Sequence, residues 1–60
     1  MSNDLPHDPF ILVSYINTLL RDRYDSLDEL CQALDIDRNY LVKRMRKVGM
    51  EYNSLLNKFW

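Results

Sequence analysis

The sequence predicts a mainly α-helical fold, a three-helix bundle that contains a helix-turn-helix and ends in a short β-hairpin or irregular tail. Apolar residues recur at helical spacing through most of the chain. Both prolines lie within the first nine residues, which leaves residues 10–48 free to be helical. One glycine and two prolines among 60 residues leave little room for long loops, and this length corresponds to a single domain over 1–60.

The first helix is expected over residues 9–23. The carboxylate of Asp8 can accept hydrogen bonds from the first free amides, and Pro9 suits the first helical position because it has no N–H to leave unpaired. The residues on its apolar face are Leu12, Val13, Ile16, Leu19 and Leu20. The residues on its opposite face are Ser14, Asn17, Thr18 and Arg21. Ile11 and Tyr15 widen the apolar arc and need a cover, which either the C-terminal tail or another subunit would supply.

Two further helices are expected over residues 26–34 and 38–48. Ser26 and Glu29 have the spacing of a capping box, Asp37 can cap the third helix, and Gly49 supplies a left-handed residue that ends it. The residues expected to face the core from this part of the chain are Leu27, Leu30, Cys31, Leu34, Ile36, Leu41, Met45 and Val48. In the tail, residues 50–60, asparagines at both ends of the segment 53–57 favour a turn between two short strands.

Residues 26–49 resemble the helix-turn-helix of bacterial regulators, with the small Cys31 where the two helices approach most closely. The third helix would then be the recognition helix, which lies in the major groove of DNA. The candidate nucleic-acid-binding residues are Arg38, Asn39, Tyr40, Lys43, Arg46 and Lys47. We expect the last three to hold phosphates and the first three to approach bases, because asparagine can read adenine and arginine can read guanine. Arg44 is expected to pair with an acid of the second helix.

Charge is distributed unevenly along the chain, although the net charge is only -1. Residues 25–37 hold five acids and no base, whereas residues 38–47 hold five bases and no acid. This change of sign has two interpretations: a nucleic-acid surface on the third helix, or ion pairs between neighbouring helices.

Two acids weigh against DNA binding. Asp35 stands where many DNA-binding helix-turn-helices have glycine, and Asp37 places a carboxylate at the tip that would approach phosphates. The alternative is therefore a protein-interaction or self-association module without nucleic-acid binding. Its interface would comprise Ile11, Tyr15 and Trp60, with Trp60 either covering the other two side chains or packing in a homodimer.

The sequence offers no catalytic arrangement, and we expect a protein that is not an enzyme. One histidine and one cysteine cannot form a metal site of the usual nitrogen and sulfur ligands, and no Gly-rich phosphate loop is present. We therefore expect no metal, cofactor or small-molecule substrate, and no concave pocket of the usual size, above about 300 Å³. No apolar run is long enough to span a membrane, and the start lacks a signal peptide, so a cytoplasmic location is expected.

A second resemblance covers nearly the whole chain. The residues that carry it are Leu5-Pro6, Asp8-Pro9, Leu20-Arg21-Asp22, Tyr24, the run from Ser26 to Cys31, Leu34-Asp35, Gly49, Tyr52, Asn57 and Phe59. Together they resemble a family of very small bacterial proteins known as domain of unknown function 4250. The resemblance implies a bacterial, cytoplasmic protein and supplies no catalytic or ligand residues. The third helix in that family is often acidic or mixed, whereas here it is basic.

Overall fold

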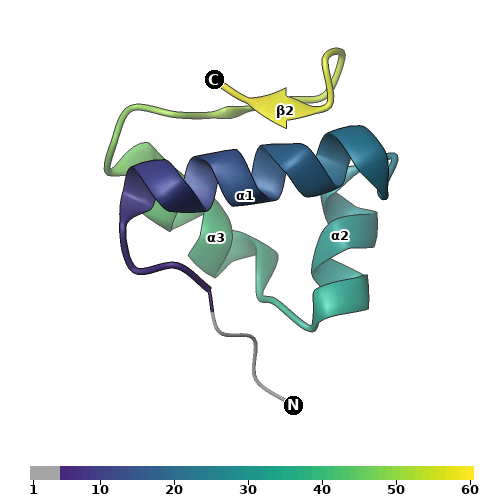
Figure 1. The fold of residues 1–60 in the computed structure, drawn as a ribbon, viewed down its shortest axis with the longest axis horizontal. Helices are drawn as coiled ribbons and strands as arrows, with labels where there is room; N and C mark the ends of the chain where they lie inside the picture. The colour runs from purple at the N-terminus through teal and green to yellow at the C-terminus, as the bar shows by residue number, and fades with distance from the viewer. Residues whose placement is uncertain (1–4) are drawn as a thin grey trace.

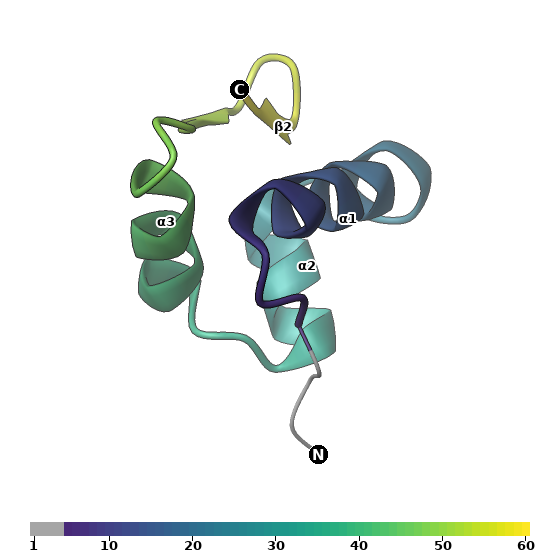
Figure 2. The same cartoon turned by 60° about the vertical axis from the view of Figure 1, so that its left-hand side comes forward.

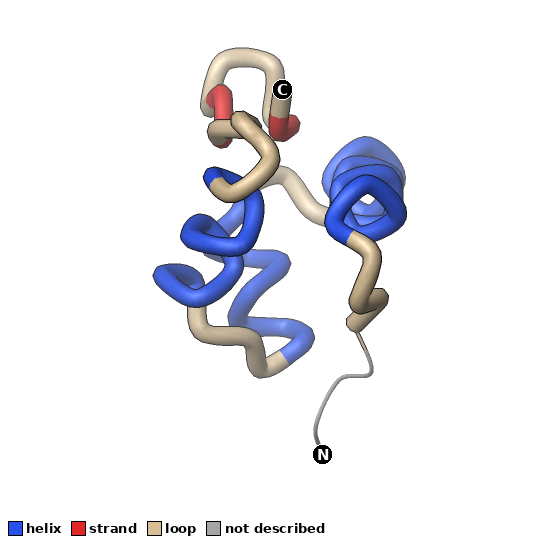
Figure 3. The backbone as a smooth tube through the Cα atoms, turned by 90° about the vertical axis from the view of Figure 1, so that its left-hand side faces the viewer, coloured by secondary structure: helices blue, strands red, loops and turns tan. Residues whose placement is uncertain are grey.

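The computed structural model describes residues 5–60, which form three helices followed by a two-stranded antiparallel hairpin. The elements are α1 (Pro9–Asp22), α2 (Leu27–Leu34), α3 (Arg38–Arg46), β1 (Tyr52–Asn53) and β2 (Lys58–Phe59). The hairpin lies across α1 on the side away from the turn that joins α2 to α3 (Figure 1). Two other views show the same order, with the hairpin at one end of the molecule and the α2–α3 turn at the other (Figures 2 and 3). The expected three-helix architecture with a C-terminal hairpin is thus confirmed.

Each helix begins at the cap that the sequence predicts. The carboxylate of Asp8 accepts from the amides of Phe10 and Ile11, at 2.8 and 3.2 Å. The hydroxyl of Ser26 accepts from the amide of Glu29 at 3.1 Å, and the carboxylate of Asp37 accepts from the amide of Asn39 at 2.9 Å. These side chains pair backbone donors that a helix start otherwise leaves without a partner.

The ends of α2 and α3 have the same construction. Asp35 and Gly49 both adopt left-handed backbone conformations, with φ of 57° and 78°. The next amide along the chain then folds back: Ile36 donates to the Cys31 carbonyl at 2.9 Å, and Met50 donates to the Met45 carbonyl at 3.0 Å. This is the hydrogen bond of a Schellman motif. The amides of Val48 and Gly49 bond to carbonyls three residues back, so the regular helix α3 ends at Arg46, two residues earlier than expected.

The core is formed by residues from all three helices and the second strand. Its members are Leu12, Val13, Ile16, Leu20, Leu27, Leu30, Cys31, Leu41, Met45 and Phe59. Around it pack half-buried side chains, among them the expected core residues Leu19, Leu34, Ile36 and Val48. Phe59 is only 1% exposed, and its ring lies 5.6 Å from that of Tyr52, so the hairpin closes one side of the core.

Two asparagines attach the hairpin to α1. Asn17, expected on the solvent face, is instead half-buried and bonds to the main chain of Phe59. Asn57, in a left-handed conformation, donates to the carbonyls of Leu20 and Tyr24, both at 3.0 Å. The expectation for Asn17 was wrong because the hairpin lies against the helix face that periodicity alone assigns to water.

Candidate nucleic-acid interface

The outward face of α3 presents three polar side chains at successive turns. Asn39, Lys43 and Arg46 are all exposed, whereas Leu41 and Met45 on the opposite face are 0% exposed. At 100° per residue, the three polar residues fall within a narrow stripe that points away from the core. The orientation of this helix predicted from the sequence is therefore confirmed, and neither the tail nor α1 covers this stripe.

Arg38 belongs to a different environment from these three residues. Its Nε lies 2.8 Å from an Oδ1 of Asp28, on the first turn of α2. Arg38 was expected to approach bases, but its rotation around α3 turns it toward the acidic helix. The ion pair is substantially exposed and contributes little stability. Its local effect is to remove one of the five positive charges from the outer surface of α3.

Arg44 makes contacts that the sequence did not indicate. Its Nη2 donates to the main-chain carbonyls of Pro6 and His7, at 2.9 and 3.0 Å. Its guanidinium carbon lies 5.9 Å from the centre of the Tyr40 ring. The expectation that Arg44 pairs with an acid of α2 was wrong, because Arg38 occupies that position and Arg44 faces the segment that precedes α1.

Three cations remain on the outer side of α3 and its C-terminal cap, namely Lys43, Arg46 and Lys47. All three are exposed, and within residues 5–60 none of them forms an ion pair. Tyr40 flanks them with a ring that is 52% exposed. Of the six residues predicted to contact nucleic acid, five thus share an accessible surface, and Arg38 is held at its border by Asp28.

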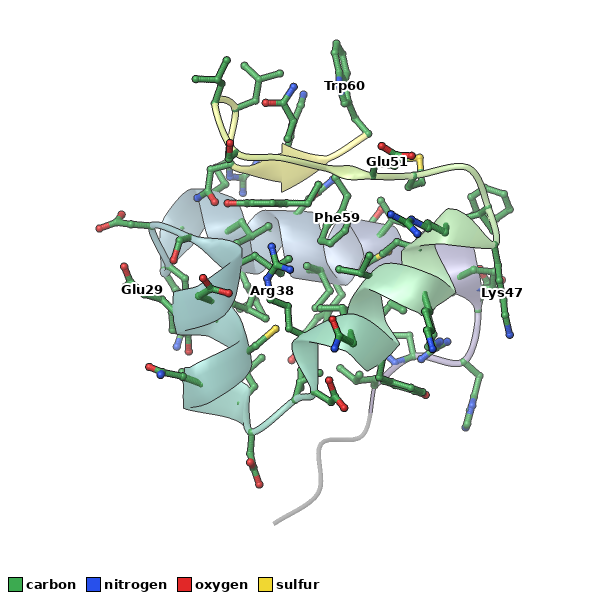
Figure 4. All side chains as sticks on the ribbon, turned by 180° about the vertical axis from the view of Figure 1, so that it is seen from behind. Glu29, Arg38, Lys47, Glu51, Phe59 and Trp60 are labelled. Atoms are coloured by element: carbon green, nitrogen blue, oxygen red, sulfur yellow. The ribbon has the colours of Figure 1, made fainter. Side chains whose placement is uncertain are left out.

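Two acids of the segment 25–37 lie at the other end of the helix-turn-helix. Asp28 and Glu29 occupy the first turn of α2, where they complement the positive end of the helix dipole. Seen from the face that carries Arg38, Glu29 lies on one side of the molecule and Lys47 on the other (Figure 4). Asp35 and Asp37, from the same acidic segment, instead lie in the turn at the start of α3. In the described part of the chain, one ion pair, between Arg38 and Asp28, joins the acidic and the basic segments.

Apolar side chains are also exposed, including the predicted interface residues. The exposed fractions of Ile11, Tyr15 and Trp60 are 57%, 42% and 65%. Trp60 points away from the helices (Figure 4), so it does not cover Ile11 and Tyr15 within one chain. Its ring instead lies 4.9 Å from the Nζ of Lys58, on the outer side of the hairpin.

Two open hollows flank the hairpin, so the expectation that the chain lacks concave space of the usual size was wrong. One, of about 670 Å³, lies between the outer face of α1 and the hairpin loop, and the other, of about 450 Å³, follows β1. Among residues 5–60, no cluster of three or more histidine, cysteine or acidic side chains could hold a metal ion. Burial of Cys31 raises the pKa of its thiol, which disfavours the reactive thiolate.

The whole described architecture lies within one family match. The family model described as Domain of unknown function (DUF4250) matches residues 6–59, from the segment held by Arg44 to the buried Phe59. The chain belongs to this family. DUF4250 therefore takes in all three helices and the hairpin. No curated protein and no solved structure matches the chain. In the described part of this DUF4250 chain, no helix is long and apolar enough to cross a membrane.

Proposed function

We propose that this protein binds double-stranded DNA through the outward face of α3. The observation that carries the proposal is the exposed stripe of Asn39, Lys43 and Arg46 on a helix that follows a helix-turn-helix turn, with Lys47 beside it. A helix with this exposure can enter a major groove, which is wide enough to admit it. We further propose a role as a small bacterial regulator, because residues 26–49 resemble the helix-turn-helix of such proteins.

The contacts divide into two kinds. Lys43, Arg46 and Lys47 carry free positive charge and supply contacts to phosphates, which position the protein without reading sequence. Asn39, in the first turn of the helix, supplies a donor and an acceptor suited to adenine, and Tyr40 borders it. Arg38 would contact DNA only if its ion pair with Asp28 broke, so we assign Arg38 a smaller contribution to DNA binding.

The turn is compatible with this docking. Asp35 adopts a left-handed conformation, which glycine adopts readily, so the turn forms here without a glycine. Asp37 remains a carboxylate near the tip, but it accepts a hydrogen bond from the Asn39 amide. Both acids nevertheless weaken attraction to phosphates, and we expect modest affinity.

The test is a titration of labelled duplex DNA at two salt concentrations. Three phosphate contacts predict that the logarithm of the binding constant falls with the logarithm of salt concentration with a slope of roughly −3, at about −0.9 per contact. The Lys43→Glu variant should bind much more weakly. The Arg23→Glu variant makes the same charge change at the end of α1 and should bind as the original protein does. No binding at low salt, or equal losses in the two variants, would reject the proposal.

The second candidate is a protein-interaction module without nucleic-acid binding. It is favoured by the exposure of Ile11 and Tyr15, which lie one turn apart on α1 and are 57% and 42% exposed within residues 5–60. A protein complex that survives replacement of both Lys43 and Arg46 by glutamate, but not Tyr15→Glu, would favour this candidate.

A further inference from the structure

The register of the hairpin leaves one main-chain donor and one main-chain acceptor free on its outer edge. Glu51 and Trp60 exchange two hydrogen bonds, at 3.2 and 3.0 Å, and the next pair is Tyr52 with Phe59. Because bonded and non-bonded pairs alternate in antiparallel strands, the N–H and C=O of Tyr52 and Phe59 point outward. The N–H and C=O of Phe59 bond to the side chain of Asn17. Within residues 5–60, the N–H and C=O of Tyr52 have no main-chain partner.

A hollow of about 450 Å³ follows this free edge of β1. Its lining residues are Gly49, Glu51, Tyr52, Asn53, Ser54, Leu55 and Trp60. The side chains of Leu55 and Trp60 at its rim are 94% and 65% exposed. Unpaired backbone groups and exposed apolar side chains therefore meet in one place, which is the usual character of a sheet edge that accepts another strand.

We propose that the β1 edge pairs antiparallel with the same edge of a second copy of this chain. The free groups belong to one residue, so a two-fold axis beside Tyr52 lets each copy donate its Tyr52 N–H to the carbonyl of the partner's Tyr52. Both free groups are then satisfied in both copies. The result is a four-stranded sheet with the order β2, β1, partner β1, partner β2.

The side chains on the outer face of the hairpin are complementary in this arrangement. With Tyr52 on the axis, Glu51 lies across from the partner's Asn53, whose neighbour on β2 is Lys58. Each copy thus turns an acid toward a lysine of the other. Beyond Asn53 the chain turns back toward β2 and leaves this register, and Leu55 stands exposed on the loop at the end of β1. This leucine lines the hollow beside the β1 edge, where the second copy would lie.

The contact involves strands of only two residues, so the dimer is weak and forms at micromolar to millimolar protein concentration. Sedimentation equilibrium of the full chain without nucleic acid tests this directly. The original protein should show a monomer–dimer equilibrium. Leu55→Glu should weaken the dimer by about tenfold or more, because it places a charge in the lining of the hollow beside the paired strands.

Leu56→Glu is the matched control. Leu56 is the next residue of the same loop, but it lines the other hollow, against α1, and not the β1 edge. The Leu56→Glu variant should dimerise like the original protein. A protein that stays monomeric up to millimolar concentration, or equal effects of the two substitutions, would overturn the proposal.

Amide hydrogen exchange supplies a second measurement. The Tyr52 amide should exchange rapidly in dilute solution and more slowly as concentration rises, because only the dimer provides its acceptor. The Glu51 amide, bonded within the hairpin, is the internal reference. A Tyr52 amide whose exchange does not depend on concentration would contradict the arrangement. Neither measurement involves DNA, so the outcome is independent of the function proposed above.

Discussion

The side-chain amide of Asn17 bonds to the main chain of Phe59 as a neighbouring strand would. Its Nδ2 donates to the Phe59 carbonyl at 2.9 Å, and its Oδ1 accepts from the Phe59 amide at 2.8 Å. A helix side chain thereby satisfies the inner edge of β2, which would otherwise face α1 with two unpaired groups. Together with the bonds that Asn57 makes to Leu20 and Tyr24, this contact holds the hairpin against α1, where the Phe59 ring lies in the core.

Replacing Asn17 should therefore destabilise the protein. Asn17→Ala leaves the N–H and C=O of Phe59 without partners, at a cost of about 1–3 kcal/mol in the free energy of unfolding. Urea unfolding followed by circular dichroism measures this loss. Thr18→Ala is the control, because the Thr18 hydroxyl donates to the Ser14 carbonyl within the same helix and not to the hairpin. Equal stability of the two variants would show that the pairing with Phe59 contributes nothing.

Asn57 and Asn53 should respond differently to the same substitution. Asn57 needs its NH₂ group to donate to Leu20 and Tyr24, and aspartate would turn a carboxylate toward those carbonyls. Asn57→Asp should lower stability by about 2 kcal/mol or more at neutral pH.

Asn53 uses only its oxygen, which accepts from the amides of Leu55 and Leu56. Asn53→Asp should therefore be nearly neutral in thermal unfolding. A larger loss from Asn53→Asp than from Asn57→Asp would show that the two roles have been assigned the wrong way round.

Asp35→Gly should stabilise the protein. Asp35 has a φ of 57°, which costs energy for a residue with a Cβ, and it sets a negative charge at the C-terminus of α2. Removal of both penalties, less the greater freedom of glycine in the unfolded chain, gives an expected gain of about 0.5–1 kcal/mol. Asp35→Ala keeps the strained backbone and should not stabilise to the same extent. A midpoint of thermal unfolding that falls for Asp35→Gly would refute this account of the turn.

The two aromatic residues that end the sequence should differ sharply in their effect on stability. Phe59 is 1% exposed, and Phe59→Ala should cost about 3–5 kcal/mol, enough to unfold much of a domain this small. Phe59→Leu offers a milder variant that can still be measured. Trp60→Ala removes a side chain that is 65% exposed and should change monomer stability by less than about 1 kcal/mol in dilute solution. A large loss from Trp60→Ala would mean that its ring is covered within one chain.

Cys31 gives the protein a predictable response to alkaline pH. Burial raises the pKa of its thiol in the folded state, so folding favours the protonated form. The stabilisation is complete below the pKa of the unfolded thiol and is lost as pH rises through the folded value. The free energy of unfolding should therefore fall between neutral and alkaline pH, and it should fall less in Cys31→Ala. Identical pH profiles for the two proteins would contradict a buried, protonated thiol.

Local signals along the chain were sufficient to predict most of the fold. The caps Asp8, Ser26 and Asp37 act on amides two or three residues away, and Gly49 ends α3 through its own backbone, so their roles are visible in short segments. The burial of Leu41 and Met45 follows from helical periodicity, and this also predicted which side of α3 is exposed.

The long-range contacts could not be predicted in the same way. Arg38 and Arg44 lie on opposite flanks of α3, and which one meets Asp28 depends on how α2 crosses it. Asn17 finds its partner 42 residues along the chain, where no spacing rule applies. In a similar sequence, two asparagines would indicate a hairpin packed on the first helix. One lies in mid-helix on the face that periodicity assigns to solvent, and the other lies in a C-terminal turn.

One series of hydrogen bonds joins the hairpin to the helix ends. The Leu27 amide donates to the Tyr52 hydroxyl, which donates to the Asn57 oxygen, and the Asn57 nitrogen donates to Leu20 and Tyr24. All of these bonds run in one direction, from the positive pole of α2 to the negative pole of α1. Each member polarises the next, so the hydroxyl of Tyr52 links the start of α2 to the end of α1. Tyr52→Phe would remove the hydroxyl that makes two of these hydrogen bonds and would keep the aromatic ring in the fold.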